Sequence, residues 1–448
     1  MEDFFRQLAS ADALGATVGS FCLILVLVRC RVPLGAAVLV GAVVLGVFFG
    51  LGPVRIGGAA LRGMFSPGSI GLGLITVLLL GLSQTMRGAG QLGEIVKLAK
   101  SLLRRPAVAM AALPALIGLL PMPGGALFSA PMVESAAGEG LEGGGRLSAI
   151  NYWFRHIWEH FWPLYPGVLL AVGHSGWSMG AYILLQFPLC FFMILSGLVM
   201  FRGVHPDLRL RGGRAPAGAK RRLLKNTSSI WIVPLVWGVG AGLARAILYS
   251  IGFSGSDVRK IEWLSAMVKY GPLIVGLIIS LLWTARLNRM DRGGLRKIFA
   301  GRSIYKLLLL VLSIMAFQRV LRETSAGAEM GAELQAMNVG VILVVAALPF
   351  ISGMVTGLAF GFVGISFPII HDMVTASPDE PMAASYIVLA YACGHIGMML
   401  TPMHVCQVVS NKYFETPFAP VYKRTIPAAC IMLVLVIAYF LVLRALGM

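Results

Sequence analysis

The chain has 448 residues, of which 58% are hydrophobic and only 12% are charged, and its formal net charge is +18. Soluble domains carry roughly 25% charged residues, so this composition excludes an ordinary soluble protein and indicates repeated apolar helices that cross a bilayer. The Lys and Arg residues gather in short loops between apolar runs, as the positive-inside rule describes, so we do not expect a nucleic-acid partner.

The apolar runs predict about ten transmembrane helices at roughly 20 residues per crossing. The N-terminal stretch MEDFFRQLAS has no basic region of a cleaved signal peptide, so we expect the first run to remain in the mature protein. The six cysteines suggest neither a disulfide framework nor a CxxC metal site. The predicted spans are 12–29, 33–52, 68–86, 148–172 and 176–201, then 229–252, 267–284, 304–321, 383–409 and 424–446.

Loop charge predicts the orientation of these spans in a cell (inner) membrane. The loops 202–228 and 285–303 are rich in Lys and Arg and should be cytoplasmic, whereas the acidic loop 322–337 should lie outside. The basic segment 87–105 should also lie inside. This assignment places both the N-terminus and the C-terminus outside.

Two further apolar stretches, 106–136 and 338–374, are interrupted near their middle by PMPGG (121–125) and SGMVTG (352–357). With the orientation above, the first must begin and end inside, and the second must begin and end outside. Each arm is about half a bilayer long at 1.5 Å per residue. We therefore predict two re-entrant hairpins with these motifs at their tips, which protein or water must surround.

The two halves of the chain share short motifs in the same order. Ala112-Leu113-Pro114 corresponds to Ala347-Leu348-Pro349, and His156-Ile157 corresponds to His395-Ile396. We predict a first repeat at 1–201, a basic cytoplasmic linker at 202–228 and a second repeat of inverted topology at 229–448. The fold class is therefore an all-α polytopic membrane protein with two inverted-topology repeats.

The span after each hairpin should be broken as well. The prolines of PLYPG (163–167) cannot continue a regular helix, and Pro402 interrupts the span 383–409. We expect breaks near 161–167 and 397–404 to converge with the two hairpin tips. Interrupted helices at matching positions of inverted repeats are typical of secondary transporters, whose sites lie between the repeats.

The stretches LIGLLPMPGGALFSAPMV (116–133) and NYWFRHIWEHFWPLYPG (151–167) resemble an uncharacterised membrane family allied to gluconate permeases. The paired hairpins resemble the ion transporter superfamily, which includes divalent-anion/sodium symporters. The resemblance implies scaffold and transport domains, a homodimer and elevator-type alternating access. It implies secondary transport of a small organic anion, a carboxylate, coupled to H⁺ or Na⁺. An inorganic anion, a proton antiport and a non-transporting receptor remain open.

The segment RHIWEH (155–160) has three interpretations. His156, Glu159 and His160 match the HxxEH pattern of zinc metallopeptidases, so an intramembrane metallopeptidase is the alternative function. A structural interpretation pairs Arg155 with Glu159 one helical turn away. The functional interpretation makes the cluster part of a transport site, because titratable groups within a span are costly and histidine titrates near neutral pH.

These arguments select the candidate site residues. The residues expected to bind substrate are Pro121, Pro123, Gly124, Gly125, Ser129, Ser352, Thr356, Gly357, Thr401 and His404. The residues expected to couple transport to an ion or to relay a proton are Glu134, His156, Glu159, His160 and His395. We assign no catalytic residue, resident metal or cofactor, and a motif search finds no phosphate-binding loop for ATP.

Overall fold

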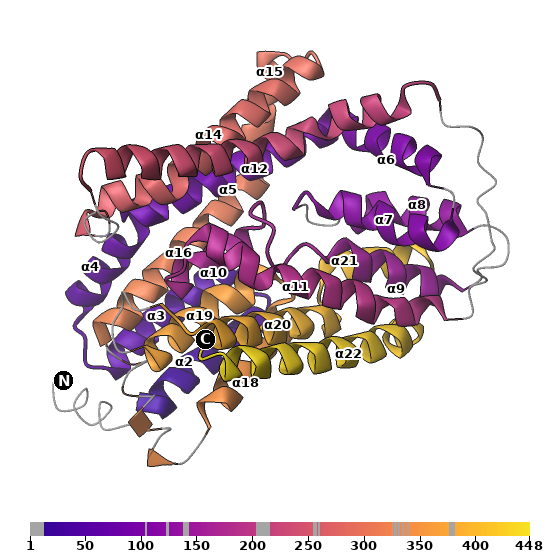
Figure 1. The fold of residues 1–448 in the computed structure, drawn as a ribbon. Helices are drawn as coiled ribbons and strands as arrows, with labels where there is room; N and C mark the ends of the chain where they lie inside the picture. Colours follow the sequence, from indigo (N-terminus) through magenta and orange to yellow (C-terminus); the bar gives the residue numbers. More distant parts are fainter. Residues whose placement is uncertain are drawn as a thin grey trace.

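A computed structural model describes residues 13–103, 105–121, 125–137, 143–202, 216–253, 258, 260–324, 326, 329, 332–333, 336–337, 340–375 and 381–448. Over these residues the chain is helical and contains no strand (Figure 1). The first half forms α2 (Ala13–Arg29), α3 (Leu34–Phe48), α4 (Pro53–Met64), α5 (Pro67–Gly88), α6 (Gln91–Leu102), α7 (Pro106–Gly118), α8 (Ala126–Ala137), α9 (Gly144–Arg155), α10 (Pro166–Ser175), α11 (Met179–Gly197) and the 3₁₀ turn η1 (Leu198–Phe201).

The second half has a similar order of elements. It forms α12 (Ala219–Ser250), α14 (Glu262–Leu287), α15 (Arg292–Phe299), α16 (Arg302–Thr324), α18 (Val341–Thr356), α19 (Ala359–Val374), α20 (Ala384–Leu400), α21 (Val405–Tyr413) and α22 (Phe418–Ala445). The short helices α4 and α15 each precede a long apolar helix and were not expected from the sequence.

Seven helical stretches of the described chain are long and apolar enough to cross a membrane. They are 67–88, 179–201, 219–250, 262–287, 302–324, 384–413 and 418–445. The helices α2 and α3 are shorter, at 17 and 15 residues, and the expected span 148–172 is divided into α9 and α10. The chain is thus an all-helical, multi-pass membrane protein, while the count of ten spans stays a prediction.

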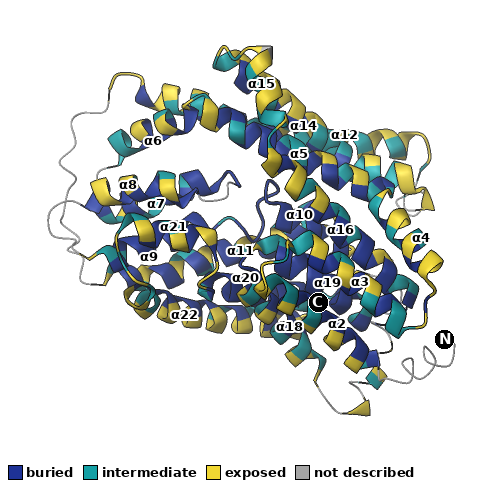
Figure 2. Cartoon of the chain, turned by 180° about the vertical axis from the view of Figure 1, so that it is seen from behind, coloured by how far each residue is buried: buried dark blue, intermediate teal, exposed yellow. Residues whose placement is uncertain are grey.

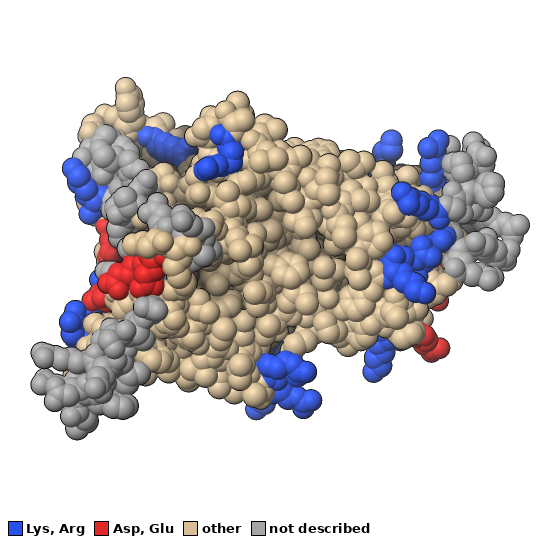
Figure 3. All heavy atoms as spheres, turned by 90° about the horizontal axis from the view of Figure 1, so that it is seen from below, with Lys and Arg blue, Asp and Glu red and all other residues tan. Residues whose placement is uncertain are grey.

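The surface agrees with this assignment. Most Lys and Arg side chains on the face in Figure 3 lie toward its ends and rims, and a broad middle carries almost no charge. The long helix α12 exposes Leu235, Val239 and Leu243, and α22 exposes Val434 and Leu441. Apolar side chains exposed along such long helices are typical of surfaces that face lipid or another apolar partner. The buried residues fill the interior between these helices (Figure 2).

Two pairs of helices lie where the hairpins were expected. The helix α7 packs on α8, and α18 packs on α19, with bounds close to 106–136 and 338–374; that these pairs re-enter the membrane stays a prediction. The expected second tip was placed too early, because α18 continues through Thr356 and the chain turns at Gly357, whose φ is +62°. Glycine adopts this left-handed conformation without steric cost.

The two hairpins open at opposite ends of the broken helices. At one end, the start of α9 lies against the carbonyl of Phe414, and Tyr413 donates a 2.6 Å hydrogen bond to Glu134 near the open end of the α7–α8 hairpin. At the other end, the amide of Met382 donates to the carbonyl of Ser175, close to where the chain returns from α19. The broken helices α9–α10 and α20–α21 therefore run antiparallel.

Helices from the two halves also pack on one another. The helix α5 packs on α14, and α3 packs on α16, so each half contributes one long helix to a pair with the other half. The helix pairs α7–α8 and α18–α19 also contact the broken helix of the other half: α19 contacts α10, and α8 contacts α21. The broken helices are thus enclosed by both hairpins.

Candidate functional site

The candidate site lies where the two broken helices cross. The helix α9 ends at Arg155, and residues 156–165 form a chain of turns before α10 begins at Pro166. The helix α20 ends at Leu400, and α21 begins at Val405. The first break begins earlier than the expected 161–167, and the second is confined to 401–404, the last part of the expected 397–404.

Proline explains why a backbone carbonyl is exposed at each break. Proline has no N–H and its ring clashes with the carbonyl four residues earlier, which for Pro163 is the carbonyl of Glu159 and for Pro402 that of Met398. Tyrosines of the opposite helix bond to these carbonyls. The hydroxyl of Tyr391 donates to the Glu159 carbonyl at 2.6 Å. The hydroxyl of Tyr152 lies 3.4 Å from the Met398 carbonyl and 3.2 Å from that of Met399.

The carboxylate of Glu159 is held between histidines from both broken helices. Its Oε1 lies 3.8 Å from Nε2 of His156, and its Oε2 lies 3.8 Å from Nε2 of His395. The residue is 8% exposed, and both histidines are buried. A buried carboxylate needs such partners, because transfer of an isolated charge out of water is costly. Glu159 thus joins the two halves of the chain.

A second histidine pair lies beside this carboxylate. The rings of His160 and His395 are in contact at a centroid distance of 4.2 Å, tilted by 47°, and His160 also contacts the ring of Tyr391. No ring nitrogen of His160 or His395 has a hydrogen-bond partner within the described part of the chain. Buried polar atoms are rarely left without partners, so these nitrogens point to a role beyond packing.

His156 is also in contact with a group of side chains formed by His404, Tyr152 and Cys406. The ring of His156 contacts that of His404 edge to face at 4.8 Å, and Tyr152 contacts both rings. Nδ1 of His156 is 2.6 Å from the carbonyl of Tyr152, so this nitrogen carries the proton in the neutral ring. The thiol of Cys406 lies in hydrogen-bonding contact with His156 and His404.

Arg155 brings a positive charge to the first hairpin. Its side chain is buried, and a Cβ atom added at Gly125 would overlap the Arg155 guanidinium. The guanidinium also contacts the Cys406 thiol. Gly125 is therefore required for the hairpin to approach the broken helix this closely. That Gly125 and Pro121 bind substrate stays a prediction; Pro121 is buried, and its carbonyl accepts a 3.5 Å hydrogen bond from the Ser83 hydroxyl.

Backbone contacts hold each hairpin against its broken helix. A Cβ atom at Gly118 would overlap the carbonyl oxygen of Arg155, and one at Gly353 would overlap that of Gly394. The hydroxyl of Tyr165 donates to the carbonyl of Gly118. Gly357, at the second hairpin's turn, lies against the backbone of His404. All four interruptions of the chain therefore meet around the histidine cluster.

The hydroxyl groups expected to bind substrate have other partners. Ser129, Ser352 and Thr356 each bond to a carbonyl of the preceding helical turn, a common arrangement in membrane helices. Thr401 accepts a 3.2 Å hydrogen bond from the amide of Met403 and so stabilises the break. These four side chains lie near the site, but their hydrogen bonds serve the backbone.

Some of the expected residues lie elsewhere. Glu134 is exposed at the open end of the first hairpin, where it accepts the bond from Tyr413, so it is remote from the histidine cluster. Pro123 and Gly124 lie outside the described residues.

The zinc geometry expected of HxxEH is not formed. Residues 156–160 are not helical, His156 faces His404, and His160 faces His395. The two histidines of the pattern therefore have different neighbours. The structural alternative keeps part of its basis: α9 ends at Arg155, but the charges of Arg155 and Glu159 attract each other, and His156 bonds to a backbone carbonyl.

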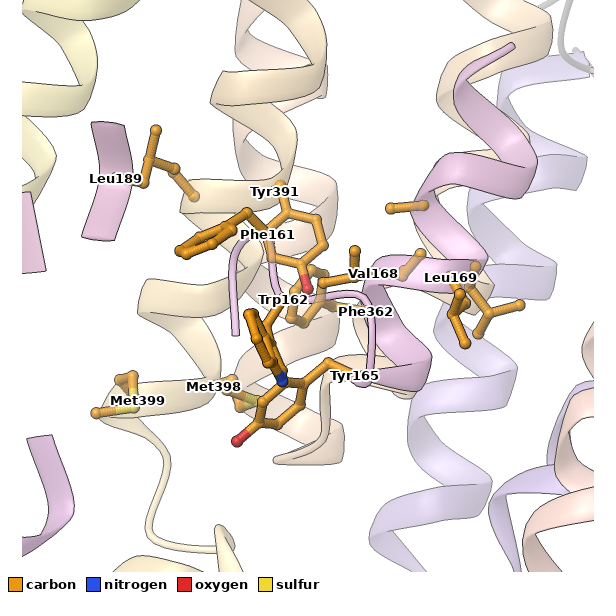
Figure 4. Packing of buried hydrophobic residues seen from close by; sticks show 14 of the residues in the cluster. Phe161, Trp162, Tyr165, Val168, Leu169, Leu189, Phe362, Tyr391, Met398 and Met399 are labelled. Carbon is orange, nitrogen blue, oxygen red and sulfur yellow. The ribbon is translucent and has the colours of Figure 1, made fainter. Parts of the chain in front are cut away.

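An apolar shell surrounds the polar cluster. Phe362 packs edge to face on Tyr391 at a ring-centroid distance of 5.3 Å, and Figure 4 shows both residues with Phe161, Trp162 and Tyr165. The indole nitrogens of Trp158 and Trp162 donate to the carbonyls of Ala115 and Leu119 in the first hairpin, at 2.8 Å and 3.1 Å. These aromatic side chains fill the space around the breaks and exclude water from the Glu159 carboxylate.

The sequence analysis missed Tyr152, Tyr391 and Cys406. A signal for the tyrosines was available, because Tyr152 precedes His156 by four residues and Tyr391 precedes His395 by four. The repeated Y-x-x-x-H spacing marks equivalent turns of the two halves. No comparable signal identifies Cys406, whose neighbours Arg155 and His156 are far away in the sequence.

Comparisons with known proteins support an assignment to a family. The model of the family described as "Protein of unknown function (DUF401)" matches residues 15–215 and 262–443. No curated protein matches the chain in sequence. The chain is similar to the solved structure of MtrF from Neisseria gonorrhoeae, described as illuminating a class of antimetabolite efflux pumps, with 14% identity, a TM-score of 0.46 and coverage of 98% of this chain and 97% of that chain. The relation to gluconate permeases stays a prediction. Since the family model matches most of its length, the chain belongs to the DUF401 family of proteins of unknown function.

Proposed function

We propose that the protein is a secondary active transporter of a small organic anion, a carboxylate, coupled to H⁺. The observation that carries this proposal is the position of Glu159. Its carboxylate is buried at the crossing of two broken membrane helices, 3.8 Å from a histidine of each helix. Ionisable groups inside a membrane protein are expensive and usually mark a substrate or ion pathway.

The titratable groups support proton coupling. Glu159, His156 and His395 can exchange protons, and the neighbouring His160 has two buried ring nitrogens without hydrogen-bond partners among the described residues. Sodium sites are built from oxygen ligands, whereas the described side chains closest to Glu159 offer mainly ring nitrogens. We therefore favour H⁺ over Na⁺ as the coupling ion.

The charge and helix ends at the first tip support an anionic substrate. The guanidinium of Arg155 lies over Gly125, and α8 begins directly afterwards at Ala126. The N-terminus of α10, at Pro166, follows the first break. Arginine binds carboxylates through paired hydrogen bonds, and helix N-termini favour negative charge. We propose that the substrate carboxylate binds between Arg155 and these helix ends.

The equivalent contacts of the two halves support the inverted repeats, 1–201 and 229–448. The hairpins open at opposite ends of antiparallel broken helices, and Gly118 and Gly353 make the same backbone contact in each half. Division into scaffold and transport domains, elevator motion, a homodimer and residence in the inner membrane are proposals that follow from the resemblance to the ion transporter superfamily.

Flux into proteoliposomes tests this function. Purified protein is first screened by thermal unfolding against sugar acids, mono- and dicarboxylates and inorganic anions, since a ligand at 100 times its Kd stabilises by about 2.7 kcal/mol. The uptake of each stabilising anion is then measured under an imposed pH gradient or Na⁺ gradient. We expect one carboxylate class to accumulate with the pH gradient. Accumulation driven only by Na⁺ would overturn the proton assignment, and absence of flux for every stabilising anion would overturn transport.

A further inference from the structure

The side chains of His156, His404 and Cys406 form a cluster of metal-ligating groups, of which the proposed transport function uses only His156. Each offers one ligand atom, and these atoms all lie within 4.8 Å of one another. All three residues are buried; His156 comes from the first break, His404 from the second, and Cys406 from the first turn of α21. We propose that this cluster is a binding site for a borderline-soft divalent metal ion, Zn²⁺.

The donor set favours zinc over the hard cations. Imidazole nitrogen and cysteine sulfur bind Zn²⁺ at about 2.0–2.3 Å, whereas Mg²⁺ and Ca²⁺ prefer oxygen ligands. Ligand atoms of a tetrahedral zinc site are therefore about 3.3–3.8 Å apart, as follows from those bond lengths. The separations of at most 4.8 Å need a contraction of about 1 Å, which side-chain rotations can supply.

The surroundings of His156 prepare it as a ligand. Its Nδ1 bonds to the carbonyl of Tyr152, which leaves the lone pair of Nε2 available. A histidine that binds a metal usually donates its other N–H in this way, which fixes the ring orientation. His404 lies in hydrogen-bonding contact with the Cys406 thiol, so one of its ring nitrogens already faces the cluster.

Charge and a fourth ligand are also available. Oε1 of Glu159 lies 3.8 Å from Nε2 of His156, so the carboxylate can complete a four-coordinate site. A thiolate and a carboxylate would balance the two charges of the ion, and Arg155 would remain as the one cation beside Cys406. Zinc bound in this way would join the two breaks and occupy Glu159, so it would hold the transport site in one state.

Cobalt substitution tests the site in purified, full-length protein. We expect Zn²⁺ to bind at about one equivalent per chain, and Co²⁺ in its place to show the near-ultraviolet charge-transfer band of a cobalt–thiolate bond. The Cys406→Ser variant should lose that band. Cys393→Ser is the matched control, because Cys393 is a buried cysteine of the preceding helix α20 and is not part of the cluster, so it should keep the band.

If Cys406→Ser does not fold, a histidine variant provides a second test of metal binding. His404→Gln keeps the thiol and should weaken Zn²⁺ binding by at least about 100-fold, the upper range for loss of an outer-shell partner. A protein that binds no Zn²⁺ after incubation and desalting, or variants that bind it as tightly as the parent, would overturn the proposal. Metal binding is measured without substrate or gradient, so its result is independent of whether the protein transports a carboxylate.

Discussion

The hydroxyl of Tyr391 donates a 2.6 Å hydrogen bond to the backbone carbonyl of Glu159. That carbonyl has no helical partner, because the residue four positions later is Pro163. On the other helix, the Tyr152 hydroxyl lies 3.4 Å from the carbonyl of Met398, four residues before Pro402, and 3.2 Å from the carbonyl of Met399. Each broken helix thus places a tyrosine hydroxyl at carbonyls beside the proline break of the other.

Replacing Tyr391 by Phe should therefore destabilise the protein. The ring contacts with His160 and Phe362 would remain, while the buried carbonyl of Glu159 would lose its donor. Leaving a buried carbonyl unsatisfied costs about 1–3 kcal/mol. Thermal unfolding of the purified variant in detergent should show the lower midpoint. Tyr305→Phe, at an exposed tyrosine, is the control and should unfold like the parent.

Alanine at Gly353 should also destabilise the fold. The added Cβ atom would overlap the carbonyl oxygen of Gly394, and neither backbone segment can move without displacing the hairpin. Overpacking of this kind costs about 1–3 kcal/mol or more. Gly93→Ala is the matched control, because Gly93 is helical and nothing lies within 4 Å of its added Cβ. Equal unfolding midpoints for the two variants would contradict the close backbone contact.

Neutralising Glu159 should abolish proton-coupled transport without unfolding the protein. Glu159→Gln keeps the shape of the side chain but cannot carry the negative charge that faces His156 and His395. We expect substrate accumulation under a pH gradient to fall to the level of empty liposomes, while the variant still elutes as a single species. Glu134→Gln, which alters an exposed carboxylate at the hairpin's open end, should retain most of the flux. Full activity of Glu159→Gln would remove Glu159 from the coupling pathway.

The hydroxyl groups near the tips should differ in their importance. Ser352→Ala should change substrate affinity little, because this hydroxyl bonds to carbonyls of its own helix. Thr401→Val should reduce stability by about 0.5–1.5 kcal/mol, because the amide of Met403 loses its acceptor in the second break. Ligand titrations and unfolding midpoints measured on both variants separate the two effects. A large loss of affinity in Ser352→Ala would show that the hydroxyl turns toward the substrate.

Much of this fold follows from local sequence patterns. Apolar runs and internal prolines locate the helix pairs α7–α8 and α18–α19 within a few residues, because a membrane tolerates few alternatives to a helix. The second tip was misplaced because Ser352 and Gly353 are compatible with a membrane helix, which continues to Thr356. The contacts of the site are harder to predict. His156 faces His404 rather than His160, since the helix assumed for HxxEH ends at Arg155.

Two engineered cysteines test whether the hairpins open on opposite sides of the membrane. Ser135 is exposed at the open end of the first hairpin, and Ser178 is exposed just after α10, at the other end of the broken helix. The positive-inside rule places the first end in the cytoplasm and the second outside. In a background with the six native cysteines replaced by serine, a membrane-impermeant maleimide added to intact cells should label Ser178→Cys and not Ser135→Cys. Inverted membrane vesicles should give the reverse result. Labelling of both positions from one side would contradict the inverted repeats, because the span between them would then fail to cross the bilayer.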